Sequence, residues 1–179
     1  MALRGLFLLL LVPYGLWLVL AYDYHFLDGV NLLFHEAGHV YLGLLGQTIG
    51  ILGGTLGQFV FPTAAGVHFL VRGKRFDAAI CALWFGENLM YTARYMGDAR
   101  AMVLPTVGGE IHDWNWLLSR WGLLDQCETL ARGTHLAGSL IVIGAMGWAG
   151  RTLWREWRGA ESDPAPGRTR TGPDRGLES

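Results

Sequence analysis

The sequence predicts an all-α protein, a polytopic transmembrane helix bundle of four to five spans with one interfacial amphipathic helix. Composition is the first reason: 51% of the 179 residues are hydrophobic, 16% are charged, and the mean hydropathy is +0.28. The second reason is that apolar runs of 18 to 23 residues recur along the chain. Soluble globular domains rarely combine these properties, so we expect most of the surface to face lipid.

The first predicted span is residues 5–22, which are 18 uncharged residues and lie near the lower length limit for crossing a bilayer. An early Arg4 before an apolar stretch also resembles a signal peptide. Because no small-residue cleavage site follows, we expect this span to be retained.

The second predicted helix covers residues 28–46, and Asp28 can cap its start. It is mostly apolar but carries the sequence HEAGH at residues 35–39. Further predicted spans follow at residues 49–71, with Pro62 inside, and at residues 76–96. The latter run is interrupted by three polar residues, Glu87, Asn88 and Arg94.

Residues 97–132 are polar and form a predicted extramembrane segment. Within it, apolar residues at spacings i, i+3, i+4 and i+7 predict an interfacial amphipathic helix. These residues are Trp114, Leu117, Leu118 and Trp121.

The last predicted span is residues 134–154. Residues 1–155 thus form one predicted transmembrane domain, and residues 159–179, rich in Gly, Pro and charge, form a predicted disordered tail.

Lys and Arg predict the topology, because positively charged loops stay in the cytoplasm. Basic residues at 72–75 mark one cytoplasmic loop, and those at 151–158 mark a cytoplasmic C-terminus. Five full spans would place the N-terminus outside. Four spans plus a half-inserted HEAGH helix would place it inside, and both versions remain open.

Charge excludes nucleic acid as a partner. The net charge is -1, the pI is near 6.6, and the sequence has no basic cluster with interleaved aromatics. The two cysteines, Cys81 and Cys127, form no CxxC pair.

Glycines in the third predicted helix repeat the small-xxx-small spacing that lets helices approach closely in lipid. We favour helix packing over a substrate-lining segment for this set, which is Gly46, Gly50, Gly53, Gly54 and Gly57.

The HEAGH sequence indicates a metal site. On a helix, His35 and His39 lie one turn apart on the same face, so their ring nitrogens can share one zinc ion. Glu36 is too far round the helix to ligate but can take a proton from a water that zinc has activated. Burying these side chains in an apolar helix would cost about 3 kcal/mol or more of folding free energy unless they bind a metal, pair with one another or are hydrated. A polar cluster that only fixes helix packing is the structural alternative.

HEAGH within an apolar helix, followed by GGTLGQ at residues 53–58 and GDARAMVLP at residues 97–105, resembles the site-2 protease group of membrane zinc peptidases, particularly its short bacterial members. The resemblance covers roughly residues 28–125. It implies zinc held by His35, His39 and Asp98, with Glu36 as the base. The family's asparagine- and proline-containing LDG motif is absent from this chain.

Three candidates compete for the third ligand. Asp98 agrees with the resemblance and is our choice, although it can also pair with Arg94 one turn away. Glu87 lies near mid-membrane and suits a fully spanning HEAGH helix. The third candidate is the pair His112 and Asp113: either could ligate, or Asp113 could orient a zinc-bound histidine. For Asp113 we favour an N-cap, and for His112 a surface or rim position.

These features predict a membrane zinc endopeptidase that cleaves membrane or membrane-adjacent protein or peptide substrates. The alternative is a non-enzymatic metal-binding, transport or scaffold protein of the membrane. The resemblance further implies the bacterial inner membrane, with the lipid bilayer as a partner. The sequence gives no indication of an oligomeric state.

Overall fold

The computed structural model describes residues 2–105, 107 and 111–162, which are 86% helical and contain no β-strand. The predicted all-α class is therefore confirmed. The helices are α1 (Ala2–Ala21), α2 (Phe26–Leu42), α3 (Gln47–Val71), α4 (Arg75–Gly97), α5 (Asp113–Trp121) and α6 (Cys127–Ser162). Short 3-10 turns, Gly43–Leu45 and Leu124–Gln126, precede α3 and α6.

The predicted helix boundaries hold to within a few residues, with two differences. α2 begins before Asp28, whose carboxylate still caps the helix by accepting the backbone N–H of His25 at 2.9 Å. α6 begins seven residues before the predicted span and continues to Ser162, so residues 159–162 of the predicted tail are helical. Residues 163–179 lie outside the described part of the chain.

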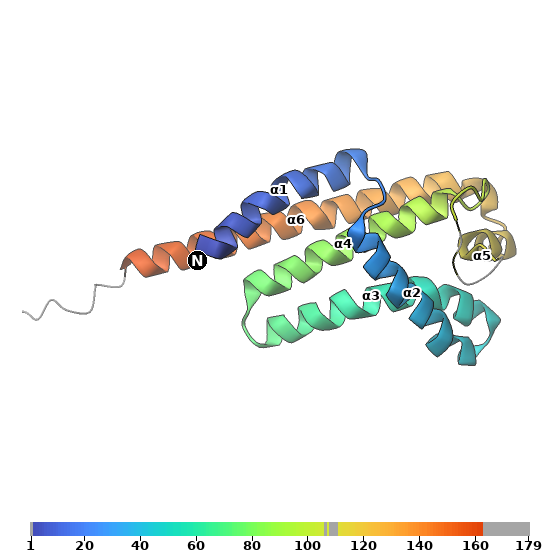
Figure 1. Cartoon of the computed structure of the whole chain (residues 1–179), viewed down its shortest axis with the longest axis horizontal. Coiled ribbons are helices and arrows are strands. Elements are labelled where there is room, and N and C mark those ends of the chain that lie inside the picture. Colours follow the sequence, from blue (N-terminus) through green and yellow to red (C-terminus); the bar gives the residue numbers. More distant parts are fainter. Residues whose placement is uncertain (1, 106, 108–110, 163–179) are drawn as a thin grey trace, which may run out of the picture.

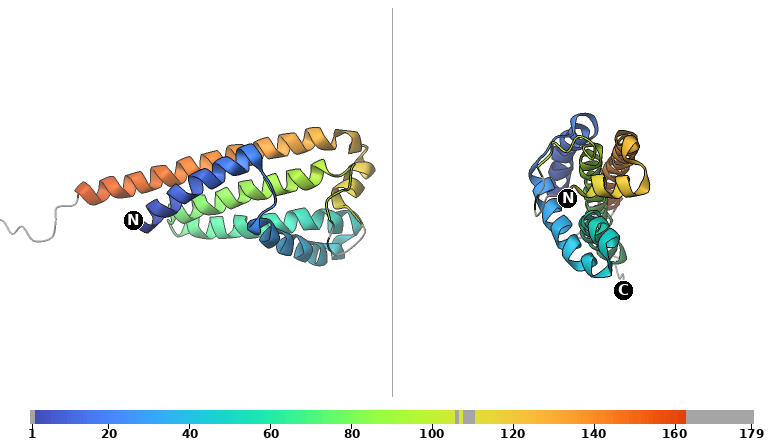
Figure 2. Two further views of the ribbon diagram at one scale, coloured as in Figure 1. Left: turned by 45° about the horizontal axis from the view of Figure 1, so that its top comes forward. Right: turned by 90° about the vertical axis from the view of Figure 1, so that its right-hand side faces the viewer.

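Four long helices, α1, α3, α4 and α6, run side by side, as Figures 1 and 2 show, with α4 packed between α3 and α6. One end of this bundle holds the start of α1, the α3–α4 turn and the last turns of α6. There the Arg4 guanidinium lies 3.5 Å from Asp77 of α4 and 3.4 Å from Glu156 of α6. α5 covers the opposite end.

α2 follows only part of the bundle's length. Near its start, the Asn31 amide donates to the carboxylate of Glu87, midway along α4, at 2.8 Å. It then runs to the end of the bundle where α3 begins (Figure 1). The arrangement is that of four long helices and one shorter helix packed on α3.

Glycines bring α2 and α3 into backbone contact. A Cβ added to Gly38 would lie 2.1 Å from the carbonyl oxygen of Gly53, and one added to Gly57 would lie 2.6 Å from that of Phe34. No side chain fits at such distances, so the helix-packing interpretation is confirmed for Gly53 and Gly57. A Cβ at Gly46 would meet no described atom within 4 Å, and one at Gly54 would meet the histidine rings of α2.

α5 is amphipathic as predicted. Trp114, Leu117 and Leu118 are buried against the end of α4 and the start of α6, whereas Trp121 is 46% exposed. The backbone N–H of Leu123 bonds to Leu118 beyond Gly122, which adopts a φ of +69° and ends the helix. α5 therefore anchors the segment that precedes it onto the bundle.

Among the described residues, two helices are long and apolar enough to cross a membrane: α1, and the helical stretch Leu124–Ala160 that contains α6. α3 and α4 have sufficient length but a lower hydropathy, because glycines and polar residues interrupt them.

Candidate metal centre

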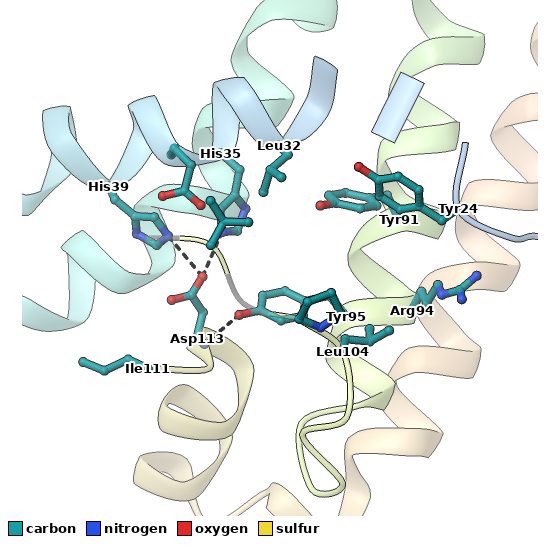
Figure 3. Close-up of a pocket in the computed structure, with 13 residues that line it drawn as sticks. Tyr24, Leu32, His35, His39, Tyr91, Arg94, Tyr95, Leu104, Ile111 and Asp113 are labelled. Carbon is teal, nitrogen blue, oxygen red and sulfur yellow. Dashed lines mark hydrogen bonds and ion pairs between the residues drawn. The ribbon is translucent and has the colours of Figure 1, made fainter. Parts of the chain in front are cut away.

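Two histidines from α2 and one carboxylate from α5 converge on a point (Figure 3). The Nε2 atoms of His35 and His39 lie 2.8 Å and 3.1 Å from the same Oδ2 atom of Asp113. Candidate ligand atoms of the three residues all lie within 4.8 Å of one another. The fold therefore brings Asp113, which is 74 positions or more from either histidine, into one compact set of candidate ligand atoms with them.

A backbone contact orients the ring of His39. Its Nδ1 donates to the carbonyl oxygen of Gly50 in α3 at 2.8 Å, so a neutral ring presents its lone pair at Nε2. Such a lone pair repels the Asp113 carboxylate unless a proton or a metal ion lies between them. This donor set, two imidazole nitrogens and one carboxylate oxygen, suits zinc.

The position of Asp113 is fixed by its own backbone. Its N–H donates to the Tyr95 hydroxyl of α4 at 3.2 Å, and Asp113 is the first residue of α5. Burial on its own would raise the pKa of Asp113, but hydrogen bonds from His35 and His39 outweigh this effect and lower it. The carboxylate is therefore ionised at neutral pH, as a metal ligand must be.

Gly54 of α3 leaves the space that the histidine rings occupy. A Cβ added there would lie 2.5 Å from the Nε2 atoms of both His35 and His39. These are the atoms that face Asp113, so the missing side chain creates room for the centre itself.

Replacing Gly54 with Ala should therefore remove metal binding, because the methyl group would occupy the position of the ligand atoms. The measurement is zinc content after purification, with Gly144→Ala as the control, since a Cβ at Gly144 meets no described atom within 4 Å. Parent-like zinc content in the Gly54 variant would refute this placement of the site.

A cavity of about 340 Å³ opens beside these three residues. Glu36 lines it, is partly exposed, and accepts no hydrogen bond from any described residue. The other walls are aromatic or apolar for the most part and include Tyr91, Tyr95 and Leu104 (Figure 3). A carboxylate, a candidate metal centre and an apolar binding surface thus meet in one cavity.

Comparison of the chain with protein-family models, with curated proteins and with solved structures gives no match.

Asp98, the predicted third ligand, does not join the histidines. It follows α4, and its carboxylate accepts the backbone N–H groups of Val103 at 3.0 Å and Leu104 at 2.9 Å. Its role in the structure is to hold the turn after α4. The geometry favours Asp113, so we revise the choice of ligand.

The prediction that Asp113 is the N-cap of α5 is wrong. His112 is the N-cap of α5, since its Nδ1 accepts the backbone N–H of Asn115 at 3.2 Å. The ring is buried rather than at the surface, stacks on Tyr95 and has its Nε2 3.4 Å from Asp98. Burial lowers the pKa of His112 and so favours the neutral ring that this cap requires.

Glu87 lies in a different cluster. It is fully buried, and its carboxylate accepts hydrogen bonds from Asn31 and Tyr22. Asp28 and His25 complete this cluster, in which candidate ligand atoms of His25, Asp28 and Glu87 lie within 4.8 Å. Every one of these side chains has a hydrogen-bond partner, so the network stabilises the contact between α1, α2 and α4.

Tyr95 and the Gly50 carbonyl were not predicted as parts of the site. Both act through contacts between helices, one with the backbone of Asp113 and one with the ring of His39. The contact of a backbone carbonyl does not depend on the residue type, so the sequence does not reveal it. A tyrosine in an apolar helix is most simply explained by packing, so nothing marked Tyr95 as part of the site.

Proposed function

We propose that this protein is an integral membrane zinc endopeptidase in which His35, His39 and Asp113 bind the metal and Glu36 is the general base. The observation that carries the proposal is the convergence of both HEAGH histidines on Asp113, at the wall of a cavity that Glu36 also lines. This arrangement retains the chemistry that the resemblance implies but replaces Asp98 with Asp113.

Three protein ligands are typical of catalytic zinc sites, which keep a further coordination position open. When bound, zinc would polarise the substrate carbonyl and make a water molecule more acidic. The space left by Gly54 and the fixed tautomer of His39 support such a site.

Glu36 supplies the proton transfers. Its carboxylate accepts a proton from the water that attacks the peptide carbonyl and returns it to the amine that leaves. The absence of a competing hydrogen bond from the described residues leaves both oxygens available for this role.

The bundle supports a membrane location with four spans, α1, α3, α4 and α6, and with α2 entering from the non-cytoplasmic side. Seven basic residues lie at the end of the bundle away from the metal centre: Arg4, Arg72, Lys74, Arg75, Arg151, Arg155 and Arg158. The preference of positive charge for the cytoplasm then places both termini inside. The bacterial inner membrane remains the location that the resemblance implies.

The substrate would be an extended segment of a membrane or membrane-adjacent protein. An open cavity with aromatic and aliphatic walls fits apolar side chains on either side of the cleaved bond. The exposed leucines of α1, which include Leu3 and Leu9, are consistent with contact between the bundle and lipid.

A cleavage assay in H₂¹⁸O tests the proposal. The zinc-loaded protein is reconstituted in liposomes with a pool of peptides from membrane proteins, and mass spectrometry detects new C-termini that contain ¹⁸O. We expect labelled fragments that disappear on chelation and return when zinc is added back. Zinc binding without any labelled fragment would favour the non-enzymatic alternative.

A further inference from the structure

We propose that the end of the bundle opposite the metal centre carries a binding site for the phosphate group of an anionic phospholipid. A pocket of about 420 Å³ lies there between the α3–α4 turn and α6. Its lining residues are Gly73, Arg75, Trp148, Arg151, Thr152, Arg155 and Glu156. This inference depends on a membrane location but not on the metal centre or on catalysis.

Three arginines give the pocket its charge. Arg151 and Arg155 lie one turn apart on α6, and Arg75 faces them from the start of α4. Within the described part of the chain, no hydrogen bond or ion pair engages these three guanidinium groups. Guanidinium groups bind phosphate oxygens through paired N–H donors, so the three are available for a phosphate group.

Two carboxylates at this end share one partner, Arg4. Glu156, the one carboxylate among the described lining residues, lies 3.4 Å from Arg4. Asp77, in the first turn of α4, lies 3.5 Å from the same guanidinium. Arg4 offsets one of these two negative charges, and the three arginines of the pocket exceed the other, so the pocket keeps a net positive charge.

Aromatic residues place the pocket at the depth of lipid headgroups. Trp148 lines it, and Trp154 and Trp157 on the following turns of α6 are 53% and 54% exposed. Tryptophan is enriched at the boundary between the apolar and polar layers of a membrane. α6 is also one of the helices apolar enough to cross a bilayer, so a headgroup bound here would leave its acyl chains beside an apolar helix surface. Basic pockets of this kind between membrane helices bind anionic headgroups.

The test is native mass spectrometry of the full-length, detergent-purified protein, titrated with phosphatidylglycerol or phosphatidylcholine. We expect phosphatidylglycerol to bind at least about tenfold more tightly than phosphatidylcholine, because each basic residue near an anionic headgroup adds to the binding free energy. The double variant Arg151→Gln/Arg155→Gln should lose this preference, and Arg75→Gln, which changes the other wall, should weaken it. The matched control, Arg100→Gln/Arg120→Gln, removes the same charge from exposed sites at the other end and should keep it.

Equal affinity for the two lipids in the parent would overturn the proposal. An equal loss in the pocket variant and in the control would also overturn it, because general charge attraction would then explain the binding. Inorganic phosphate is then added as a competitor in the same titration. If millimolar phosphate displaces the lipid completely, the site recognises free phosphate rather than a phospholipid, and the proposal is wrong.

Discussion

Replacing Asp113 with Asn should lower zinc affinity by more than about 100-fold, the upper end of the loss caused by altering an outer-shell partner of a metal ligand. The side chain keeps its size but loses the negative charge and one anionic oxygen. Asp113 Oδ2 is the atom that both His35 and His39 face, and Asp113 is the one carboxylate in this group of described candidate ligands. Competition with a chromophoric chelator measures the change.

Asp98→Asn is the matched control, since it makes the same chemical change at the ligand implied by the resemblance. The amide oxygen of Asn can accept only one of the two N–H groups, from Val103 and Leu104, that the two carboxylate oxygens accept, so the turn should lose about 1 kcal/mol of stability. Because Asp98 does not belong to the group of atoms around the histidines, zinc affinity should stay within about threefold of the parent. Loss of zinc in Asp98→Asn alone would restore the original choice of ligand. Loss in neither variant would mean that no single aspartate of this pair holds the metal.

Replacing Glu36 with Gln should reduce the rate of peptide hydrolysis by about 10²- to 10⁴-fold, the usual contribution of a general base. Gln has the same shape but cannot accept a proton from water. Glu36 lines the cavity without joining the metal-ligand group, so zinc content should be unchanged. Initial rates on a peptide identified in the ¹⁸O assay, measured at equal zinc loading, check this expectation.

The control for this variant is Glu128→Gln, an equivalent change at an exposed glutamate that pairs with Arg100 and does not line the cavity. It should keep the parent's rate. Undiminished hydrolysis by the Glu36 variant would show that another group moves the proton, and the proposed mechanism would be wrong.

The helices were predictable because each depends on local sequence. Long apolar runs and turn residues such as Gly73, with a φ of +70°, determine where the helices begin and end. A close helix contact at Gly53 and Gly57 was also predictable, because glycines four residues apart lie on the same face of a helix. In the structure both of them meet the backbone of α2.

The third residue of the candidate metal centre was not predictable, because its position depends on how the chain returns after α4. Asp98 and Asp113 are both acidic residues of the same polar segment, and sequence alone does not distinguish a turn-forming carboxylate from a ligand. Two contacts decide between them. The N–H groups of Val103 and Leu104 donate to the carboxylate of Asp98. The Tyr95 hydroxyl accepts the N–H of Asp113 and holds that residue beside the histidines.

The position of α2 likewise needed tertiary information. Its apolar flanks allow either a full span or a half-length helix, and the choice depends on where Asn31 and His39 find partners. The carboxylate of Glu87, midway along α4, accepts a hydrogen bond from Asn31. The carbonyl of Gly50, near the end of the bundle, accepts one from His39. These contacts, and not the apolar flanks, decide where α2 lies on the bundle.

The most direct test of the metal centre is the zinc content of the detergent-purified parent protein, combined with X-ray absorption spectroscopy at the zinc edge. We predict about one zinc per chain, coordinated only by nitrogen and oxygen at about 2.0–2.2 Å. Absence of zinc, despite metal supplied during expression, would contradict the account and make His35, His39 and Asp113 a structural polar cluster. Sulfur in the coordination shell would contradict it as well, because the ligand would then be a cysteine.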